Sequence, residues 1–437
     1  RDFDAAVGVE IDPKTKHWVR TVHIADVGAF AKPGGPLDAE ARRRATSIYL
    51  PQKVIPMFPE VISNGLASLQ EGKVRYVKTV RMEFTPGLQK GHVQFFNGAI
   101  RNRKRFTYDE VQAVLDSFEG KADPPPSPLP AGRGSEGLSS SPLAASREDA
   151  PAKPQAPAGS PLPAGRGAGG VGSSPPPDLL AMLKRMRDLA LLLRKKRFKR
   201  GALELTMPEA VLEYDADGRV SGAHFAEHNL SHRIVEEFML AANEAVAEHF
   251  NHHEVPFLRR VHPAPNEDKL EAFAQFAAIL GYPIRRPQDR FELQRALDAT
   301  ADKPERAAFH FALLRSLKQA AYSPVQDEHY ALASHHYCHF TSPIRRYPDL
   351  QVHRLLDRWL RNGSASANSA ELVALGEHCS KMERRAEAAE RELVKTRILA
   401  YLSGRLGEQL DAVITGVADY GFFAQAERFP AEGLVHI

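Results

Sequence analysis

The amino-acid sequence predicts a mixed α/β domain of the α+β type with a disordered Pro/Gly-rich insertion, followed by the start of an OB-fold β-barrel. Short apolar runs separated by turns fill residues 1–120 and return over residues 408–437. Amphipathic helical patterns fill residues 179–407, and residues 121–178 contain almost no large apolar side chains. A chain of 437 residues exceeds what one ordinary core organises, so we expect more than one domain.

The first region opens with the pattern of a β-hairpin. Val7, Val9 and Ile11 alternate with other residues, as the inward positions of a half-buried strand do. The turn signal Asp12-Pro13-Lys14 follows, and residues 19–24 are again largely apolar. We therefore predict two antiparallel strands joined at this turn.

The segment 121–178 differs from its surroundings in composition. It consists mainly of Pro, Gly, Ser and Ala, and the string SPLPAGRG occurs twice, at 127–134 and 160–167. Such a segment buries too little apolar surface to offset its ordering entropy, so we predict a disordered insertion. An adaptor role resting on this segment is disfavoured, because the repeats lack a PxxP-type ligand pattern.

Helical spacing of apolar residues dominates after the insertion. It begins at Leu179, and a further helix is expected to start near Ser231. Further helices are expected near 268–280, 289–299, 304–320 and 370–405. The last of these presents a single apolar seam, which is typical of packing against a core.

Composition narrows the class of protein. No run of about 18 apolar residues is present, so no transmembrane helix is expected. Cys338 and Cys379 are too few for a disulfide framework or a structural zinc site, which favours the cytoplasm. The net charge of +4 indicates nucleic acid only weakly. Because the sequence starts at Arg1 and stops at Ile437 inside a predicted strand, we expect a fragment with both ends missing.

Asp2 and Asp4 form the first candidate site. Alternate residues of an extended chain project to the same face, and two carboxylates there can hold a hard divalent cation between them. Taken alone, the pair is more typical of a solvated turn. His23 and Asp26 also have a spacing that suggests a metal, but hydrogen bonding that holds a strand end is the preferred interpretation.

The segment HFTSPIRRYPDL, residues 339–350, forms the second candidate site. It contains Arg345 and Arg346 next to a Pro-anchored turn. The planar fork of arginine suits phosphate oxygens and can stabilise charge that develops during hydrolysis. By composition alone, a surface pair or partners of buried carboxylates is the preferred interpretation.

Aromatic residues follow in the last region. Tyr420, Phe422 and Phe423 occupy a strand pattern that is typical of the beginning of an OB-fold. Aromatic side chains in such modules stack on bases, although core positions are an equal alternative here.

Six sequence blocks, in this order, resemble the ribonuclease II / ribonuclease R family: RDFDAAV (1–7), HIADVGAF (23–30), VIPMFPEVISNGLASL (54–69), HRIVEEFMLAAN (232–243), HFTSPIRRYPDL (339–350) and ERRAEAAERE (383–392). Together they span nearly the whole chain outside the insertion. The resemblance implies a mixed α/β catalytic domain, with N-terminal OB modules before it and an S-one domain after it. The N-terminal modules and most of the S-one domain would be missing here.

The resemblance also implies an activity. Members hydrolyse single-stranded RNA processively from its 3′ end to 5′-mononucleotides, with Mg²⁺ or Mn²⁺ as cofactor. Asp2 and Asp4 correspond to metal ligands, Asp4 and Arg345 to catalytic residues, and Arg346 to a supporting RNA-binding residue. Single-stranded RNA is the expected partner of a monomer, with no membrane association and no identifiable protein partner.

Further RNA-binding residues follow from the same resemblance. Tyr49 corresponds to an aromatic residue that stacks near the 3′ end, and Tyr108 to a tyrosine that contacts the terminal nucleotide. Glu236 or Glu237 corresponds to a glutamate that contacts the terminal ribose, although their place in the first turn of a helix also suits the helix dipole. Glu390 corresponds to a glutamate near the phosphates.

Ala5 departs from the family pattern RDFDDAV, in which an Asp stands at this position. An alanine cannot bind a metal ion, so at least one metal site should be weakened. The alternative function is therefore a catalytically impaired homologue that binds RNA and does not cleave it.

Overall fold

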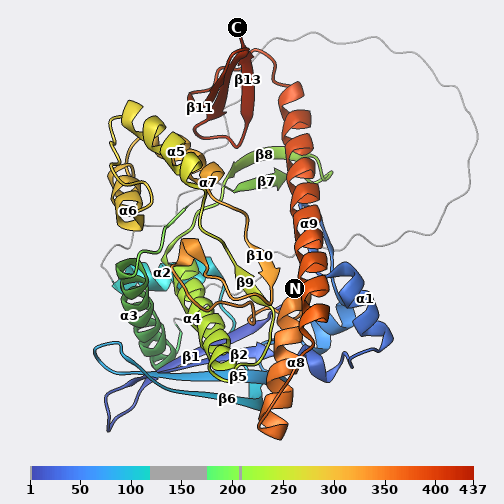
Figure 1. The fold of residues 1–437 in the computed structure, drawn as a ribbon. Coiled ribbons are helices and arrows are strands. Elements are labelled where there is room, and N and C mark those ends of the chain that lie inside the picture. The colour runs from blue at the N-terminus through green and yellow to red at the C-terminus, as the bar shows by residue number, and fades with distance from the viewer. Residues whose placement is uncertain (1, 119–174, 206–208) are drawn as a thin grey trace, which may run out of the picture.

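The computed structural model describes residues 2–118, 175–205 and 209–437 (Figure 1). The predicted insertion 121–178 lies outside the described residues except for its last four. Of these, Pro177 and Asp178 already belong to α3 (Pro177–Lys199), so this helix begins two residues before the predicted Leu179.

An antiparallel four-stranded sheet forms the base of the fold, in the order β1-β2-β5-β6. Its strands are β1 (Ala5–Ile11), β2 (Trp18–Ala25), β5 (Val74–Phe84) and β6 (Lys90–Arg101). The predicted hairpin is confirmed, with Val7 opposite Val22 in the register of β1 and β2. Figure 1 shows α3 and α4 (Leu230–His252) packed over this sheet, and residues of all these elements share one apolar core.

A second core lies where the connection from β2 to β5 meets the last two long helices. The connection contains η1 (Val27–Ala29), α1 (Pro36–Arg44), β3 (Ile48–Leu50), β4 (Lys53–Ile55) and η2 (Val61–Leu66). The helices are α8 (Tyr347–Asn362) and α9 (Ser369–Ser403), and α2 (Tyr108–Phe118) follows β6. Cys338 and Cys379 are both buried free thiols.

A third core belongs to a helical unit of α5 (Glu267–Ile279), α6 (Arg290–Ala299) and α7 (Arg306–Ser316). Two short pairings accompany it: β9 (Arg259–Val261) with β10 (Ala321–Ser323), and β7 (Ala210–Tyr214) with β8 (Val220–Phe225). The short η3 (Tyr330–Leu332) follows β10. The helices predicted here are confirmed, although α7 ends at Ser316 rather than near residue 320.

The chain ends in a three-stranded antiparallel sheet, β11 (Ala412–Ala418), β12 (Gly421–Ala426) and β13 (Glu432–His436). Figure 1 shows this sheet at the far end of α9 from the four-stranded sheet. A meander of three strands is compatible with the start of an OB-fold, which stays a prediction.

Among the helices described, none combines the length and the apolar character needed to cross a membrane.

Candidate active site

The acidic segment that leads into β1 is held from two sides. The Phe3 carbonyl accepts a hydrogen bond from the Leu69 N–H (3.0 Å), and the Phe3 N–H donates to Ser68 Oγ (3.1 Å). At the end of β2, the Ala25 N–H donates to the Asp4 carbonyl (2.8 Å). These bonds fix the backbone that carries the predicted acid pair.

The arginine loop reaches this segment through backbone pairing with the chain before β3. The Ser47 N–H donates to the Arg345 carbonyl (3.0 Å), and the Tyr347 N–H donates to the Ala45 carbonyl (2.9 Å). Tyr49 follows in β3. Three segments that are far apart in the sequence therefore meet at one place.

Asp4 occupies the centre of this meeting point. One of its oxygens lies 3.5 Å from Arg345 Nε, and the other accepts the Ile344 N–H at 3.2 Å. The Asp4 side chain is only 10% exposed, whereas that of Arg345 is 44% exposed and open to a ligand. Burial raises the pKa of Asp4 to about 7, against the opposing effects of Arg345 and the Ile344 N–H, and repulsion by Asp2 raises it further.

Tyr49 joins the site through the other carboxylate. Its hydroxyl donates a hydrogen bond to Asp2 Oδ2 at 2.7 Å. Burial raises the pKa of the Tyr49 hydroxyl, and the bond to Asp2 raises it further, so the hydroxyl stays protonated as a donor. The structure thus brings Asp2, Asp4, Tyr49 and Arg345 together, and the roles that the resemblance implies for them stay predictions.

The raised pKa of Asp4 predicts a pH-dependent stability. The folded chain keeps this proton up to a pH of about 7, whereas an unfolded aspartate releases it near 3.8. The folded state therefore holds the extra proton inside this window, and the free energy of unfolding falls as the pH rises through it. In metal-free buffer, we expect the unfolding free energy to drop by roughly 2–3 kcal/mol between pH 5 and 8, relative to Asp4→Asn.

Chemical denaturation of both proteins at pH 5 and 8 measures this difference. Glu10→Gln, which changes an exposed carboxylate of the adjoining strand β1, is the matched control and should follow the parent protein. If the parent and Asp4→Asn lose stability in parallel, the Asp4 side chain is ionised at pH 5, and the burial effect is absent.

The acid pair fits a divalent cation in part. Mg²⁺ is commonly held by one or two carboxylates, with water and substrate phosphate completing its shell. A buried carboxylate with a raised pKa also gains from a nearby positive charge. In the described part of the chain, no group of three or more His, Cys, Asp or Glu side chains is placed to hold a metal ion. Ala5 opens β1 and packs with Val7 against the apolar core of the sheet.

Arg346 has a structural partner. It forms an ion pair with Asp349 (2.7 Å), whose side chain is fully buried and also accepts the Ser342 N–H (2.7 Å). The pair therefore stabilises the turn from which Arg345 projects. For Arg346, the structure therefore agrees with the alternative that the arginines are partners of buried carboxylates. RNA binding by Arg346 stays a prediction.

The two glutamates of α4 have different environments. Glu237 is buried and bonded to Arg197, with Nε 3.1 Å from Oε1, and burial raises the pKa of Glu237 in spite of that partner. The Glu236 side chain is 53% exposed and only 3.5 Å from the edge of the same guanidinium. Because α4 begins at Leu230, both lie beyond its first turn, and the expected position in the first turn is wrong. Glu236 is the one of the two that can contact a ligand.

Tyr108 lies at the first position of α2 and stacks on His232 of α4, with ring centroids 3.9 Å apart and planes at 18°. Tyr108 is 44% exposed, so one face of this aromatic pair remains accessible. The stacking partner was not predicted from the sequence. The only indication of His232 in the sequence is that it is the first residue of the family-like block HRIVEEFMLAAN.

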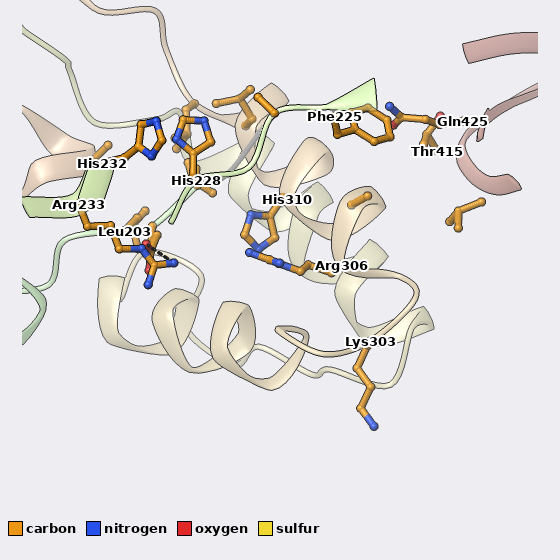
Figure 2. Close-up of a pocket in the computed structure, with 18 of the residues that line it drawn as sticks. Leu203, Phe225, His228, His232, Arg233, Lys303, Arg306, His310, Thr415 and Gln425 are labelled. Atoms are coloured by element: carbon orange, nitrogen blue, oxygen red, sulfur yellow. Dashed lines mark ion pairs between the residues drawn. The ribbon is translucent and has the colours of Figure 1, made fainter. Parts of the chain in front are cut away.

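A cavity of about 950 Å³ adjoins this stack (Figure 2). Its lining includes the histidines and basic residues labelled in Figure 2, His228, His232, His310, Arg233, Lys303 and Arg306, together with the acidic Glu204, Glu236 and Glu427. Thr415 and Gln425 of the C-terminal sheet close the cavity on one side. The cavity thus leads from the C-terminal sheet to Glu236 and the Tyr108–His232 stack.

Glu390 lies half-buried on α9, away from the contacts that define the Asp4 site. Its neighbours on the helix are engaged, Glu383 with Arg260 (2.6 Å) and Glu387 with Arg391 (2.5 Å). Burial raises the pKa of Glu390, and repulsion by Glu209 and Glu387 adds to this. Among the described residues, Glu390 is therefore the one of the three glutamates without an ion-pair partner.

The C-terminal aromatics are partly accessible. Tyr420 is 51% exposed in the turn between β11 and β12, and Phe422 and Phe423 are half-buried on β12. Phe422 and Phe423 point to opposite faces of their strand. The three residues do not touch the Asp4 site, and base stacking by them stays a prediction.

Comparison with known proteins places this fold and site in a class. The model of the RNB domain matches residues 1–362. Ribonuclease R of Aquifex aeolicus is 33% identical over 444 residues, which cover 100% of this chain and 55% of that protein. Ribonuclease R of Mycoplasma genitalium in complex with ribose-methylated single-stranded RNA superimposes with a TM-score of 0.82 at 26% identity, covering 100% of this chain and 61% of that one.

The chain belongs to the RNB family. Its curated relatives include ribonucleases R, and the chain spans about half their length. Yeast Ssd1, described as a pseudonuclease, has the same fold with a TM-score of 0.71 at 18% identity, covering 99% of this chain and 47% of that one. The fold alone therefore does not decide between cleavage and binding.

Proposed function

We propose that this chain is the catalytic part of a 3′→5′ exoribonuclease that processively hydrolyses single-stranded RNA to 5′-mononucleotides, with Mg²⁺ or Mn²⁺ as cofactor. The observation that carries the proposal is the contact of Arg345 with the buried Asp4, beside Asp2 and Tyr49. The similarity to ribonucleases R supports it. A monomer that acts in the cytoplasm belongs to the same proposal.

The site residues have complementary roles in this mechanism. Asp2 and Asp4 would hold the divalent cation, which activates water and neutralises phosphate charge when bound. The exposed guanidinium of Arg345 binds the phosphate oxygens and stabilises the negative charge that grows on them during attack. Tyr49 keeps Asp2 oriented through its hydroxyl, while its ring stacks near the 3′ end of the strand.

The RNA strand would approach along this cavity. Lysine and arginine side chains there attract phosphates, and bases stack on the open face of the Tyr108–His232 pair. Glu236 accepts a hydrogen bond from a ribose hydroxyl, which favours RNA over DNA. We propose further contacts with the strand from Glu390, Arg346, Tyr420, Phe422 and Phe423.

Two labelled forms of one unpaired RNA test the reaction. With 3′ label, the mononucleotide should appear from the first time point. With 5′ label, the full-length strand should be converted to a short end product without accumulation of intermediate lengths, because the proposed reaction is processive. A DNA strand of the same sequence should survive. Cleavage at internal positions would contradict the exonuclease proposal.

A second candidate function is RNA binding without cleavage. Ala5 supports it, because this position contributes no carboxylate to the acid pair and packs towards the core. Tight binding of the unpaired RNA, with no release of the 3′ label in either Mg²⁺ or Mn²⁺, would favour this function over the nuclease.

The glutamates of α4 give a matched pair of variants. We expect Glu237→Gln to lower the unfolding free energy by about 3 kcal/mol, because it leaves the buried Arg197 with only the exposed Glu236, 3.5 Å away, as an ion-pair partner. Glu236→Gln should leave stability nearly unchanged and should reduce the preference for RNA over a strand with a 2′-deoxy 3′ terminus. Denaturation curves and competition between the two strands measure these effects. Equal losses of stability in both variants would contradict the division of roles.

A further inference from the structure

A second cleft, of about 800 Å³, lies between α8, the η1–α1 segment and the first turns of α9. Asp2, Asp4, Tyr49 and Arg345 are not among the residues that line it. Clefts of this size commonly hold small ligands. The cleft is therefore separate from the proposed catalytic site.

Arginines of α8 form one wall of the cleft. Arg354, Arg358 and Arg361 are four and three residues apart, so they share one face of the helix. Lys32 and Arg42 line the cleft from the η1–α1 side. A phosphate between these walls would meet guanidinium groups whose planar forks match its oxygens.

Ion pairs occupy most of the acidic groups in the cleft. Asp38 is bonded to Arg354 (2.7 Å), and the buried Lys78 lies between Asp26 (3.3 Å) and Asp357 (3.2 Å). By contrast, the cations Lys32, Arg42 and Arg358 are exposed and have no carboxylate partner among the residues that the structure describes. Glu371 is the one carboxylate of the described lining without an ion pair, so these three cations leave the cleft with a surplus of positive charge.

Two buried acceptors in the cleft lack donors. His353 is fully buried, and its Nε2 donates to the Phe340 carbonyl at 2.7 Å, which leaves Nδ1 as an acceptor without a partner in the described structure. Burial lowers the pKa of His353 to about 3, so the ring is neutral near pH 7. Asp26 Oδ1 is a second buried acceptor without a partner there. Ligand hydroxyl groups would satisfy both atoms.

We propose that this cleft binds a ribonucleoside monophosphate, with its phosphate on Arg42 and Arg358 and its ribose hydroxyls towards Asp26 and His353. Cations without partners and acceptors without donors in one cleft match the two polar ends of that ligand. The same chemistry is present in a nucleotide of an RNA chain, so the test separates the free nucleotide from the chain. The proposal does not depend on catalysis, since it shares no residue with the Asp4 site.

Calorimetric titration of the whole chain in EDTA tests the proposal with 5′-AMP, adenosine and a short unpaired RNA. EDTA removes metal-mediated phosphate binding at the acid pair. We expect 5′-AMP to bind at least tenfold more tightly than adenosine. Arg358→Gln and Arg42→Gln should each weaken 5′-AMP by about tenfold, the usual size of one charge-assisted contact. Arg295→Gln, an exposed arginine outside the cleft, and Asp4→Asn should leave the affinity unchanged.

Both arginines are exposed, so their variants should fold, and thermal melting checks this. Three results would overturn the proposal: 5′-AMP that binds no better than adenosine, 5′-AMP affinity that is insensitive to both arginines, or loss of 5′-AMP binding in Asp4→Asn. Arginine-dependent binding of the RNA strand alone would instead assign the cleft to the RNA backbone, and the mononucleotide proposal would be wrong.

Discussion

Arg345→Ala is expected to reduce the single-turnover rate of RNA cleavage by roughly 10²–10³-fold, while RNA affinity changes far less. The Arg345 side chain is 44% exposed next to the nearly buried Asp4, so its guanidinium can bind the phosphate while negative charge grows on the phosphate oxygens. An interaction that strengthens in the transition state lowers the rate constant much more than it lowers ground-state binding. Single-turnover decay of 3′-labelled RNA and equilibrium binding in EDTA measure the two effects separately.

Two further variants control this experiment. Arg345→Lys keeps the charge and loses the planar fork, and should recover only part of the rate. Arg346→Ala removes the partner of the buried Asp349 and should lower the melting temperature, which Arg345→Ala should not do. If cleavage by Arg345→Ala continues near the parent rate while affinity collapses, Arg345 is a binding residue and its catalytic role is wrong. If the parent cleaves RNA too slowly to be measured, the parent and all variants are compared in the Ala5→Asp background.

Local patterns of the sequence were sufficient for much of the fold. The hairpin of β1 and β2 follows from alternation before one turn and apolar residues after it, and α9 follows from apolar spacing of three and four. Both signals depend on neighbours along the chain, which the sequence displays directly. The start of α4, one residue before the predicted Ser231, shows how closely a local pattern can place a boundary.

Long-range partners could not be predicted in the same way. Glu236 and Glu237 are adjacent and chemically identical, yet only Glu237 is buried, in an ion pair with Arg197 of α3. Likewise, Arg345 and Arg346 are adjacent, but Arg346 forms an ion pair with the buried Asp349, whereas Arg345 stays exposed. Such differences arise from packing between elements, for which a single sequence contains no periodic signal.

The position of Ala5 gives the largest expected gain of function. We expect Ala5→Asp to increase the cleavage rate at limiting Mg²⁺ by about tenfold or more, the usual size of an effect on metal affinity. A third carboxylate next to Asp4 adds negative charge that helps to hold divalent cations close together. The parent should therefore require more Mg²⁺ or Mn²⁺ than the variant, and cleavage rates measured over a metal titration test this expectation.

Ala5→Asn is the matched control for the new side chain. It has nearly the size of Asp without its charge, so it should not reproduce the gain if charge is the cause. RNA affinity in EDTA should not improve in Ala5→Asp, because an added carboxylate repels phosphate. In the structure, Ala5 packs with Val7 against the apolar core, so the new carboxylate must turn towards Asp4 to act. A lower melting temperature with no gain in rate would mean that it stays on the core side, and that position 5 is not a vacant metal ligand in this chain.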